Sequence, residues 1–170
     1  ISRKRKYLTA SAPYFFITPY WETLADTKFA QRQFASLVAD LPVLLTLGEG
    51  KLNEGFGFHL ASSYYFLAQY DKVISVTQQM IMANPAYAAP YVLQGYSRLA
   101  QKQFPEAERI FLAALQRNPN QQAAVEGLAH VYFLAGNRAR ALDVLTETTK
   151  FSFSAEARQR FDALKALYAQ

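Results

Sequence analysis

Cysteine is absent from this sequence, and histidine occurs only twice. The lack of cysteine excludes a disulfide framework, a thiol nucleophile and thiolate metal ligands, and it leaves the redox compartment undetermined. We favour the cytoplasm and keep the periplasm as the alternative. His59 and His130 are the side chains that titrate near neutral pH, but no acidic residue is spaced to orient either one. Because a metal site also needs three or four convergent ligands, we predict a protein that is not an enzyme and holds no cofactor and no metal.

Long apolar runs are missing too. No stretch approaches the roughly 18 apolar residues that cross a bilayer, so we expect no transmembrane segment. The residues after Ile1 are too polar for the apolar region of a secretory signal peptide, and a start at isoleucine fits a fragment or processed product of a longer chain. Gly55 and Gly57 follow no predicted strand, so they do not indicate a nucleotide-binding loop.

Most of the chain carries little excess of either positive or negative charge. The net charge is +5, and Arg3, Lys4, Arg5 and Lys6 supply four of these five charges. From Tyr7 onward 14 basic residues face 13 acidic ones, so the body is nearly neutral. A short basic tail can touch nucleic acid or an anionic membrane surface, but no patterned basic helix follows it. We predict a solvated tail and no specific nucleic-acid partner.

The chain does contain a period of 34 residues, because Asn84-Pro85 and Asn118-Pro119 are separated by that number. Between these pairs, apolar residues recur at spacings of three and four on both sides of a break at Lys102-Gln103, which predicts two helices and a turn. The same template continues before and after this copy. Such a period indicates an array of helical hairpins, none of which buries its apolar faces alone.

These copies resemble the tetratricopeptide repeat family, from Glu54 to about Phe151. The central copy carries the family's small, aromatic and proline residues at Tyr91, Gly95, Ala107, Phe111, Ala114 and Pro119, and the third copy carries Leu128, Ala129, Tyr132, Gly136 and Ala141. Departures include Val73 for the second-helix alanine, Lys102 for the turn glycine and Thr148 for the last alanine. The resemblance implies an all-α, right-handed solenoid of antiparallel helix pairs. Ala61, Gly95 and Ala129 then mark close approaches between paired helices.

We predict one domain with helical regions at both ends of the repeats. Within the N-terminal region we expect a helix from Pro19 to Asp40, interrupted by Pro42, and a linker at Gly48–Lys51. Ser154 is predicted to cap the last helix. The predicted parts are a basic and aromatic N-terminal arm (1–18), an N-terminal helical cap and linker (19–53), three repeats (54–87, 88–121 and 122–151) and a C-terminal capping helix (152–170).

In this family the first helices of successive hairpins line a concave groove that holds an extended peptide or a helix. Members that bind acidic tails place lysines, asparagines and an arginine there, whereas this chain has Phe58, Ser62, Leu93, Ala123 and Gly127 at those positions. An uncharged aromatic lining favours an apolar or aromatic partner, although any single residue is equally accounted for as repeat core. Transferred by register, the groove residues are Phe58, His59, Ser62, Tyr65, Phe66, Val92, Leu93, Tyr96, Leu99, Glu126, His130, Phe133 and Leu134.

Two functions follow from this interpretation. The first is a non-catalytic protein-protein interaction module that binds an apolar or aromatic segment of a protein or peptide partner and acts as an adaptor or scaffold. The alternative is a secretion or assembly chaperone resembling the type III translocator chaperones. The arm over residues 12–21 combines two prolines with five aromatics. We expect it to occupy an aromatic groove of its own or of a second copy, or to pack on the flank of the first hairpin.

Overall fold

The computed structural model describes residues 18–47 and 54–170. Within these ranges the chain forms nine α-helices, one short 3-10 helix and no strand, so the prediction of an all-α fold is confirmed. Most of the predicted arm and the predicted linker at Gly48–Lys51 lie outside the described residues. The helices are α2 (Thr18–Ala30), α3 (Phe34–Leu47), α4 (Glu54–Phe66), α5 (Tyr70–Ala83), α6 (Ala88–Ala100), α7 (Phe104–Arg117), α8 (Gln122–Leu134), α9 (Arg138–Glu147), η2 (Thr148–Lys150) and α10 (Ala155–Tyr168).

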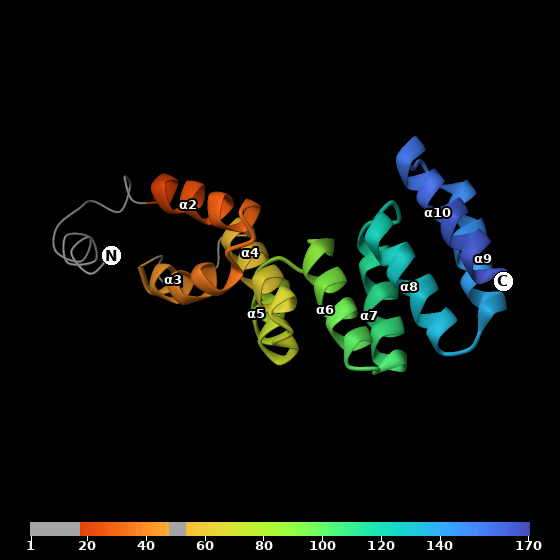
Figure 1. Cartoon of the computed structure of the whole chain (residues 1–170), viewed down its shortest axis with the longest axis horizontal. Coiled ribbons are helices and arrows are strands. Elements are labelled where there is room, and N and C mark those ends of the chain that lie inside the picture. The colour runs from red at the N-terminus through yellow and green to blue at the C-terminus, as the bar shows by residue number, and fades with distance from the viewer. Residues whose placement is uncertain (1–17, 48–53) are drawn as a thin grey trace.

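Consecutive helices pair into hairpins, and the hairpins stack in chain order. Figure 1 shows one row of helices that begins with α2 and α3 at one end and finishes with α9 and α10 at the other. The second helix of each hairpin packs on the first helix of the next, as α5 does on α6 and α7 does on α8. The first helices α4, α6 and α8 also contact one another in sequence. This arrangement is the predicted solenoid of antiparallel helix pairs.

The prediction of a single helix from Pro19 to Asp40 is wrong. The helix is interrupted at residues 31–33, and Pro42 lies inside α3. Arg32 adopts a left-handed backbone conformation with φ of 56°, which reverses the chain direction. The sequence hides this break, since the three turn residues include neither glycine nor proline.

The N-terminal region therefore repeats the geometry of the later hairpins. A helix of 13 residues and a helix of 14 residues are joined by a three-residue turn in α2/α3, in α4/α5 and in α6/α7. The middle residue of each turn has a positive φ, and the series runs Arg32, Ala68, Lys102 and Gly136, with values of 56°, 56°, 60° and 81°. Only the last is a glycine, the residue that adopts this conformation without a steric cost.

The Asn-Pro pairs end the second helices, as predicted. The Asn84 N–H donates to the Met80 carbonyl, and the Asn118 N–H donates to the Ala114 carbonyl. Each asparagine side-chain oxygen then accepts a hydrogen bond from the backbone N–H two residues later, at 3.2 Å for Asn84 and 3.0 Å for Asn118. This asparagine turn is the mechanism by which the dipeptide stops the helix.

The centre of the core is the ring of Phe111 on α7. Its side chain is fully buried, and a Cβ atom added at Gly95 or at Gly127 would lie 2.7 Å or 2.3 Å from its ring atoms. Gly95 belongs to the same hairpin and Gly127 to the next one, so one ring fills the space between three helices. The predicted close approach is thus confirmed at Gly95. Ala61 and Ala129, the corresponding residues of the other two copies, are fully buried.

At the C-terminal end, Ser154 caps α10 as predicted, because its hydroxyl accepts a hydrogen bond from the Ala157 N–H at 3.2 Å. Phe161 and Tyr168 on this helix are each 1% exposed. Their burial seals the last apolar face of the described hairpins.

The turn geometry predicts opposite effects for one substitution at two exposed alanines. Ala68→Gly removes the strain of a left-handed alanine and should raise the free energy of unfolding by up to about 1 kcal/mol. Ala135 has an ordinary φ of −76°, so Ala135→Gly should lower it by about 0.5–1 kcal/mol. Urea titrations measure both, and equal losses at the two positions would contradict the assigned turn conformation.

The Phe111 wedge predicts that Gly127→Ala destabilises the protein although alanine is the better helix former. The new methyl group meets a ring that neighbouring helices hold on both sides, which should cost about 1–3 kcal/mol. Replacing the ring by the smaller side chain of Phe111→Leu should reduce the loss of stability that Gly127→Ala causes. A double-mutant cycle measures this coupling. Additive losses would show that the ring and the glycine do not compete for the same space.

Candidate functional site

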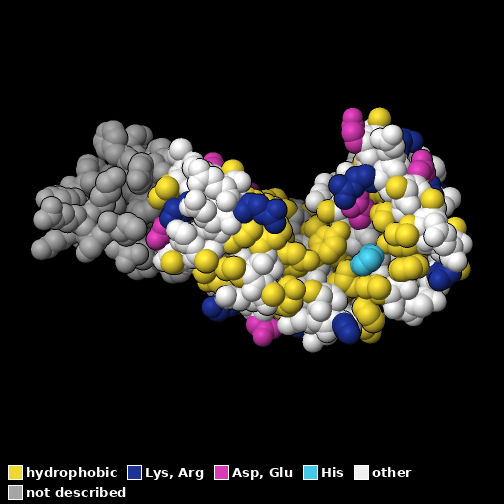
Figure 2. All heavy atoms as spheres, in the orientation of Figure 1, with side chains coloured by type: hydrophobic (Ala, Val, Ile, Leu, Met, Phe, Trp, Pro, Cys, Tyr) yellow, Lys and Arg dark blue, Asp and Glu magenta, His cyan; other side chains and the backbone are white. Residues whose placement is uncertain are grey.

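The predicted groove residues lie on the first helices α4, α6 and α8, and Figure 2 shows hydrophobic side chains gathered over the hollowed middle of one face of the molecule. We call the face that these helices form the first-helix surface. Three of its predicted members are buried, because Ser62, Val92 and Leu99 are only 4%, 7% and 8% exposed. Ser62 lies on α4, which packs on α5 and α6, while Val92 and Leu99 lie on α6, which packs on α5 and α7. The hairpin stack therefore buries these three residues, and they do not line an open groove.

The α2/α3 hairpin covers the N-terminal end of the first-helix surface. Phe66 stacks on Phe34 with ring centroids 4.5 Å apart, and His59 Nε2 lies 2.7 Å from an Asp26 carboxylate oxygen. Phe29 also packs on His59, at 4.8 Å between centroids. Phe58 is half-buried in the same cluster. These predicted groove residues are therefore docking contacts for the N-terminal hairpin.

Helix α10 covers the opposite end. Phe133 stacks on Tyr168 with centroids 4.2 Å apart, and the Tyr168 hydroxyl lies 3.0 Å from His130 Nδ1. Burial lowers the pKa of His130, which favours the neutral imidazole. Arg160 reaches Glu126 with two of its nitrogens, each 3.1 Å from a carboxylate oxygen. The only charged residue among the predicted groove positions is thus neutralised.

Between these covered ends, Tyr65, Leu93 and Tyr96 remain partly exposed, and Leu134 is 48% exposed. Tyr96 is held on two sides, because its hydroxyl donates to the Ala123 carbonyl at 2.9 Å and its ring meets Phe111 edge-on. Burial is the main cause of the raised pKa of Tyr96, and Glu126 raises it further. This ring is therefore a rigid, uncharged element in the middle of the surface.

Tyr65 on α4, Tyr96 on α6 and Tyr168 on α10 belong to three different helices, and Tyr65 and Tyr168 both contribute to the raised pKa of Tyr96. The hydroxyls of Tyr96 and Tyr168 have partners, whereas the Tyr65 hydroxyl makes no hydrogen bond with the described residues. The open part of the first-helix surface thus offers aromatic faces, aliphatic carbon and the Tyr65 hydroxyl. Among residues 18–47 and 54–170 this hydroxyl has no partner, and the one charged residue of the predicted groove, Glu126, is paired.

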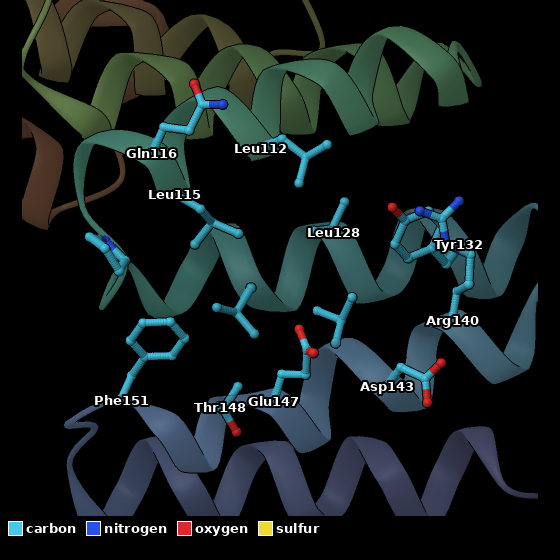
Figure 3. Close-up of a pocket in the computed structure, with 13 residues that line it drawn as sticks. Leu112, Leu115, Gln116, Leu128, Tyr132, Arg140, Asp143, Glu147, Thr148 and Phe151 are labelled. Atoms are coloured by element: carbon cyan, nitrogen blue, oxygen red, sulfur yellow. The ribbon is translucent and has the colours of Figure 1, made fainter.

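A second hollow lies between α7 and α9, on a face that the sequence did not indicate. This α7–α9 groove has a volume of about 590 Å³. Leu112 and Leu115 face Asp143 and Glu147 across it, and Phe151 lies at one end (Figure 3). Helix α9 has only 10 residues against 14 in α5 and α7. The one feature of the sequence that pointed to this hollow was Thr148, which replaces the last alanine of the repeat pattern in the third copy. At this position a 3-10 turn replaces the final turn of the helix.

Other kinds of site are not found in the described part of the chain. Across residues 18–47 and 54–170, no three His, Cys, Asp or Glu side chains lie close enough together to hold a metal ion. None of the helices in the same ranges is long and apolar enough to cross a membrane.

Comparison with known proteins agrees with this architecture. A family model described as "Tetratricopeptide repeat" matches residues 98–170, which run from the end of α6 through α10. No curated protein sequence matches the chain.

Solved structures with the same arrangement share little sequence with it. TTC0263, a thermophilic TPR protein of Thermus thermophilus, superposes with a TM-score of 0.73 at 18% identity, over 88% of this chain and 79% of that one. The TPR2B domain of yeast Sti1, in a complex with pHsp70, gives 0.58 at 20% identity, over 65% and 90%. The type III secretion translocator chaperone SycD of Yersinia enterocolitica gives 0.57 at 14% identity, over 71% and 88%. At these identities the likeness establishes the fold.

The hydrogen bonds of the tyrosines predict that removing the hydroxyl group has different effects on stability at Tyr96 and at Tyr65. Tyr96→Phe leaves the Ala123 carbonyl without its donor in a partly buried site, and it should lower the free energy of unfolding by about 0.5–1.5 kcal/mol. Tyr65→Phe removes a hydroxyl that has no described partner and should be nearly neutral. Denaturant titration of both variants checks this, and a Tyr65→Phe loss as large as that of Tyr96→Phe would overturn the assignment.

Proposed function

We propose that this chain, a tetratricopeptide-repeat protein, is a non-catalytic interaction module that binds an extended apolar or aromatic segment of a partner protein on its first-helix surface. In this role it acts as an adaptor or scaffold that holds the segment for a larger assembly. The observation that carries the proposal is the open centre of this surface, where the uncharged side chains of Tyr65, Leu93 and Tyr96 stay partly exposed.

The energetics favour a ligand of this chemistry. An aromatic side chain buries about 150–250 Å² when it is covered, and Tyr96 is already ordered, so little side-chain entropy is lost on binding. An extended peptide also brings backbone N–H and C=O groups that need partners. The Tyr65 hydroxyl, which has no partner among the described residues, would hydrogen-bond one of them and so supply orientation as well as affinity.

Charge argues against an acidic tail as the ligand. The clamp positions of the family hold Phe58, Ser62 and Leu93 in this chain, together with Ala123 and Gly127. Arg160 already pairs with Glu126, donating one hydrogen bond to its carboxylate and lying 3.1 Å from the other carboxylate oxygen. A carboxylate on this surface would lose its hydration without gaining an unpaired cation.

A secretion or assembly chaperone remains the second candidate. The observation in its favour is the similarity of fold to SycD, which extends over 88% of that chain. Both functions use an apolar segment on the same surface and differ in what happens to the segment afterwards. Neighbouring reading frames that encode secretion components would favour the chaperone.

The ligand class can be tested with a phage-displayed library of random peptides of about 12 residues, which span roughly 40 Å when extended. We expect selected sequences to be enriched in Phe, Tyr, Trp and Leu and depleted in Asp and Glu. Leu134→Asp places a charge on the open surface and should weaken the selected peptides about tenfold, or about 1.4 kcal/mol. Tyr65→Phe should weaken them less and leave stability unchanged.

Met82→Asp is the matched control, because Met82 is 75% exposed and lies on the second helix α5. It makes the same charge change away from the first-helix surface and should leave binding intact. Enrichment of acidic peptides, or equal losses for Leu134→Asp and Met82→Asp, would count against the proposal.

A further inference from the structure

The α7–α9 groove is independent of the proposed function, because second helices form its walls. Its floor and walls are mostly apolar, and Leu112 and Phe151 are each 41% exposed there. Exposed large apolar side chains that gather in one hollow mark an interaction site more often than scattered ones do. The residues that line the groove are Leu112, Leu115, Gln116, Pro119, Val125, Leu128, Tyr132, Arg140, Asp143, Val144, Glu147, Thr148 and Phe151.

The charges on the rim leave an excess of negative charge. Arg140 lies 3.7 Å from the Glu108 carboxylate, and its guanidinium lies over the Tyr132 ring. Glu147 pairs with Lys150 at 3.2 Å, and both of these side chains are well exposed, so the pair is weak. Asp143 has no partner among the described residues and stands one helical turn before Glu147 on the same face of α9. A ligand that combines cations with apolar side chains therefore complements this groove.

The chain itself contains one segment with that combination. Residues 3–8 read Arg-Lys-Arg-Lys-Tyr-Leu and hold the only run of four consecutive charges of one sign in the sequence. We propose that residues 3–8 of a second copy of this protein dock in the α7–α9 groove. The basic residues face Asp143 and Glu147, and Tyr7 and Leu8 cover the apolar floor between Leu112 and Phe151.

A second copy is a better source of this segment than the same molecule. Helix α2 and the groove belong to opposite ends of the row of helices (Figure 1). The path from α2 to α8 crosses α4 and α6, which at 8–10 Å per helix pair is roughly 24–30 Å. The ten residues from Leu8 to Thr18 reach about 33–36 Å only when fully extended. Docking within one molecule would therefore require residues 8–18 to be almost fully extended, whereas docking of a second copy does not.

The absence of cysteine allows a direct test in the full chain, since each introduced thiol is then the only one. Thr9→Cys protein is activated as a mixed disulfide with thionitrobenzoate. The thiolate of a Gln116→Cys protein attacks the Thr9→Cys sulfur, forms the disulfide between the two copies and expels coloured thionitrobenzoate. Gln116 is exposed and lines the groove (Figure 3), so docking raises the effective concentration of the two sulfurs.

Gln159→Cys is the matched control, since Gln159 is exposed on α10 outside the groove. Each rate is divided by the rate of the same thiol with activated glutathione, which removes differences in thiol reactivity. We expect the normalised rate at Gln116→Cys to exceed that at Gln159→Cys about tenfold at low salt. About 0.5 M NaCl should remove most of this excess.

Reversing the charges of the groove shows whether the faster reaction comes from docking or from random collision. Asp143→Lys combined with Glu147→Lys, added to the Gln116→Cys protein, should abolish the excess rate. Asp162→Lys makes the same kind of change at an exposed carboxylate on α10 and should preserve the excess. Equal normalised rates at Gln116→Cys and Gln159→Cys, or an excess that survives the double reversal, would overturn the proposal. So would a Thr9→Cys/Gln116→Cys chain that closes its own disulfide while the mixed copies do not react.

Discussion

The ring of Phe111 fills the space that Gly95 and Gly127 leave open between α6, α7 and α8. Because neither glycine has a Cβ, the two first helices approach the ring closely, and the spacing between consecutive hairpins follows from its size. Burial of one aromatic ring on both faces stabilises the pairing within a hairpin and the stacking of the next hairpin at once. The continuity of the solenoid through its middle depends on this contact.

Stacking of this kind creates two different surfaces. The first helices α4, α6 and α8 are drawn together, and only the middle of their shared face stays open. The second helices α7 and α9 instead have a hollow between them, beside the short α9. The first surface is aromatic and uncharged at its centre, while the second combines an apolar floor with an acidic rim. The two surfaces therefore differ in their chemistry.

Aromatic stacking also closes both ends of the first-helix surface. Phe34 of the N-terminal hairpin stacks on Phe66, and Tyr168 of α10 stacks on Phe133. These contacts use side chains that the repeat register assigns to ligand binding. The terminal helices thus cover the two ends of the first-helix surface, and they bury apolar side chains that would otherwise be exposed. Between the two covered ends, Tyr65, Leu93 and Tyr96 stay partly exposed.

The sequence by itself determined the hairpins over residues 54–151, because their signals are local. Apolar spacing sets each helix, an asparagine turn ends α5 and α7, and small residues such as Gly95 mark the close contacts. Only the tertiary structure decided which groove residues stay accessible, since the exposure of Val92 or Leu99 depends on helices far away in the chain. The break at Arg32 and the α7–α9 groove escaped prediction for the same reason. A left-handed residue without glycine and a hollow between two second helices arise from packing, and neither has a sequence pattern of its own.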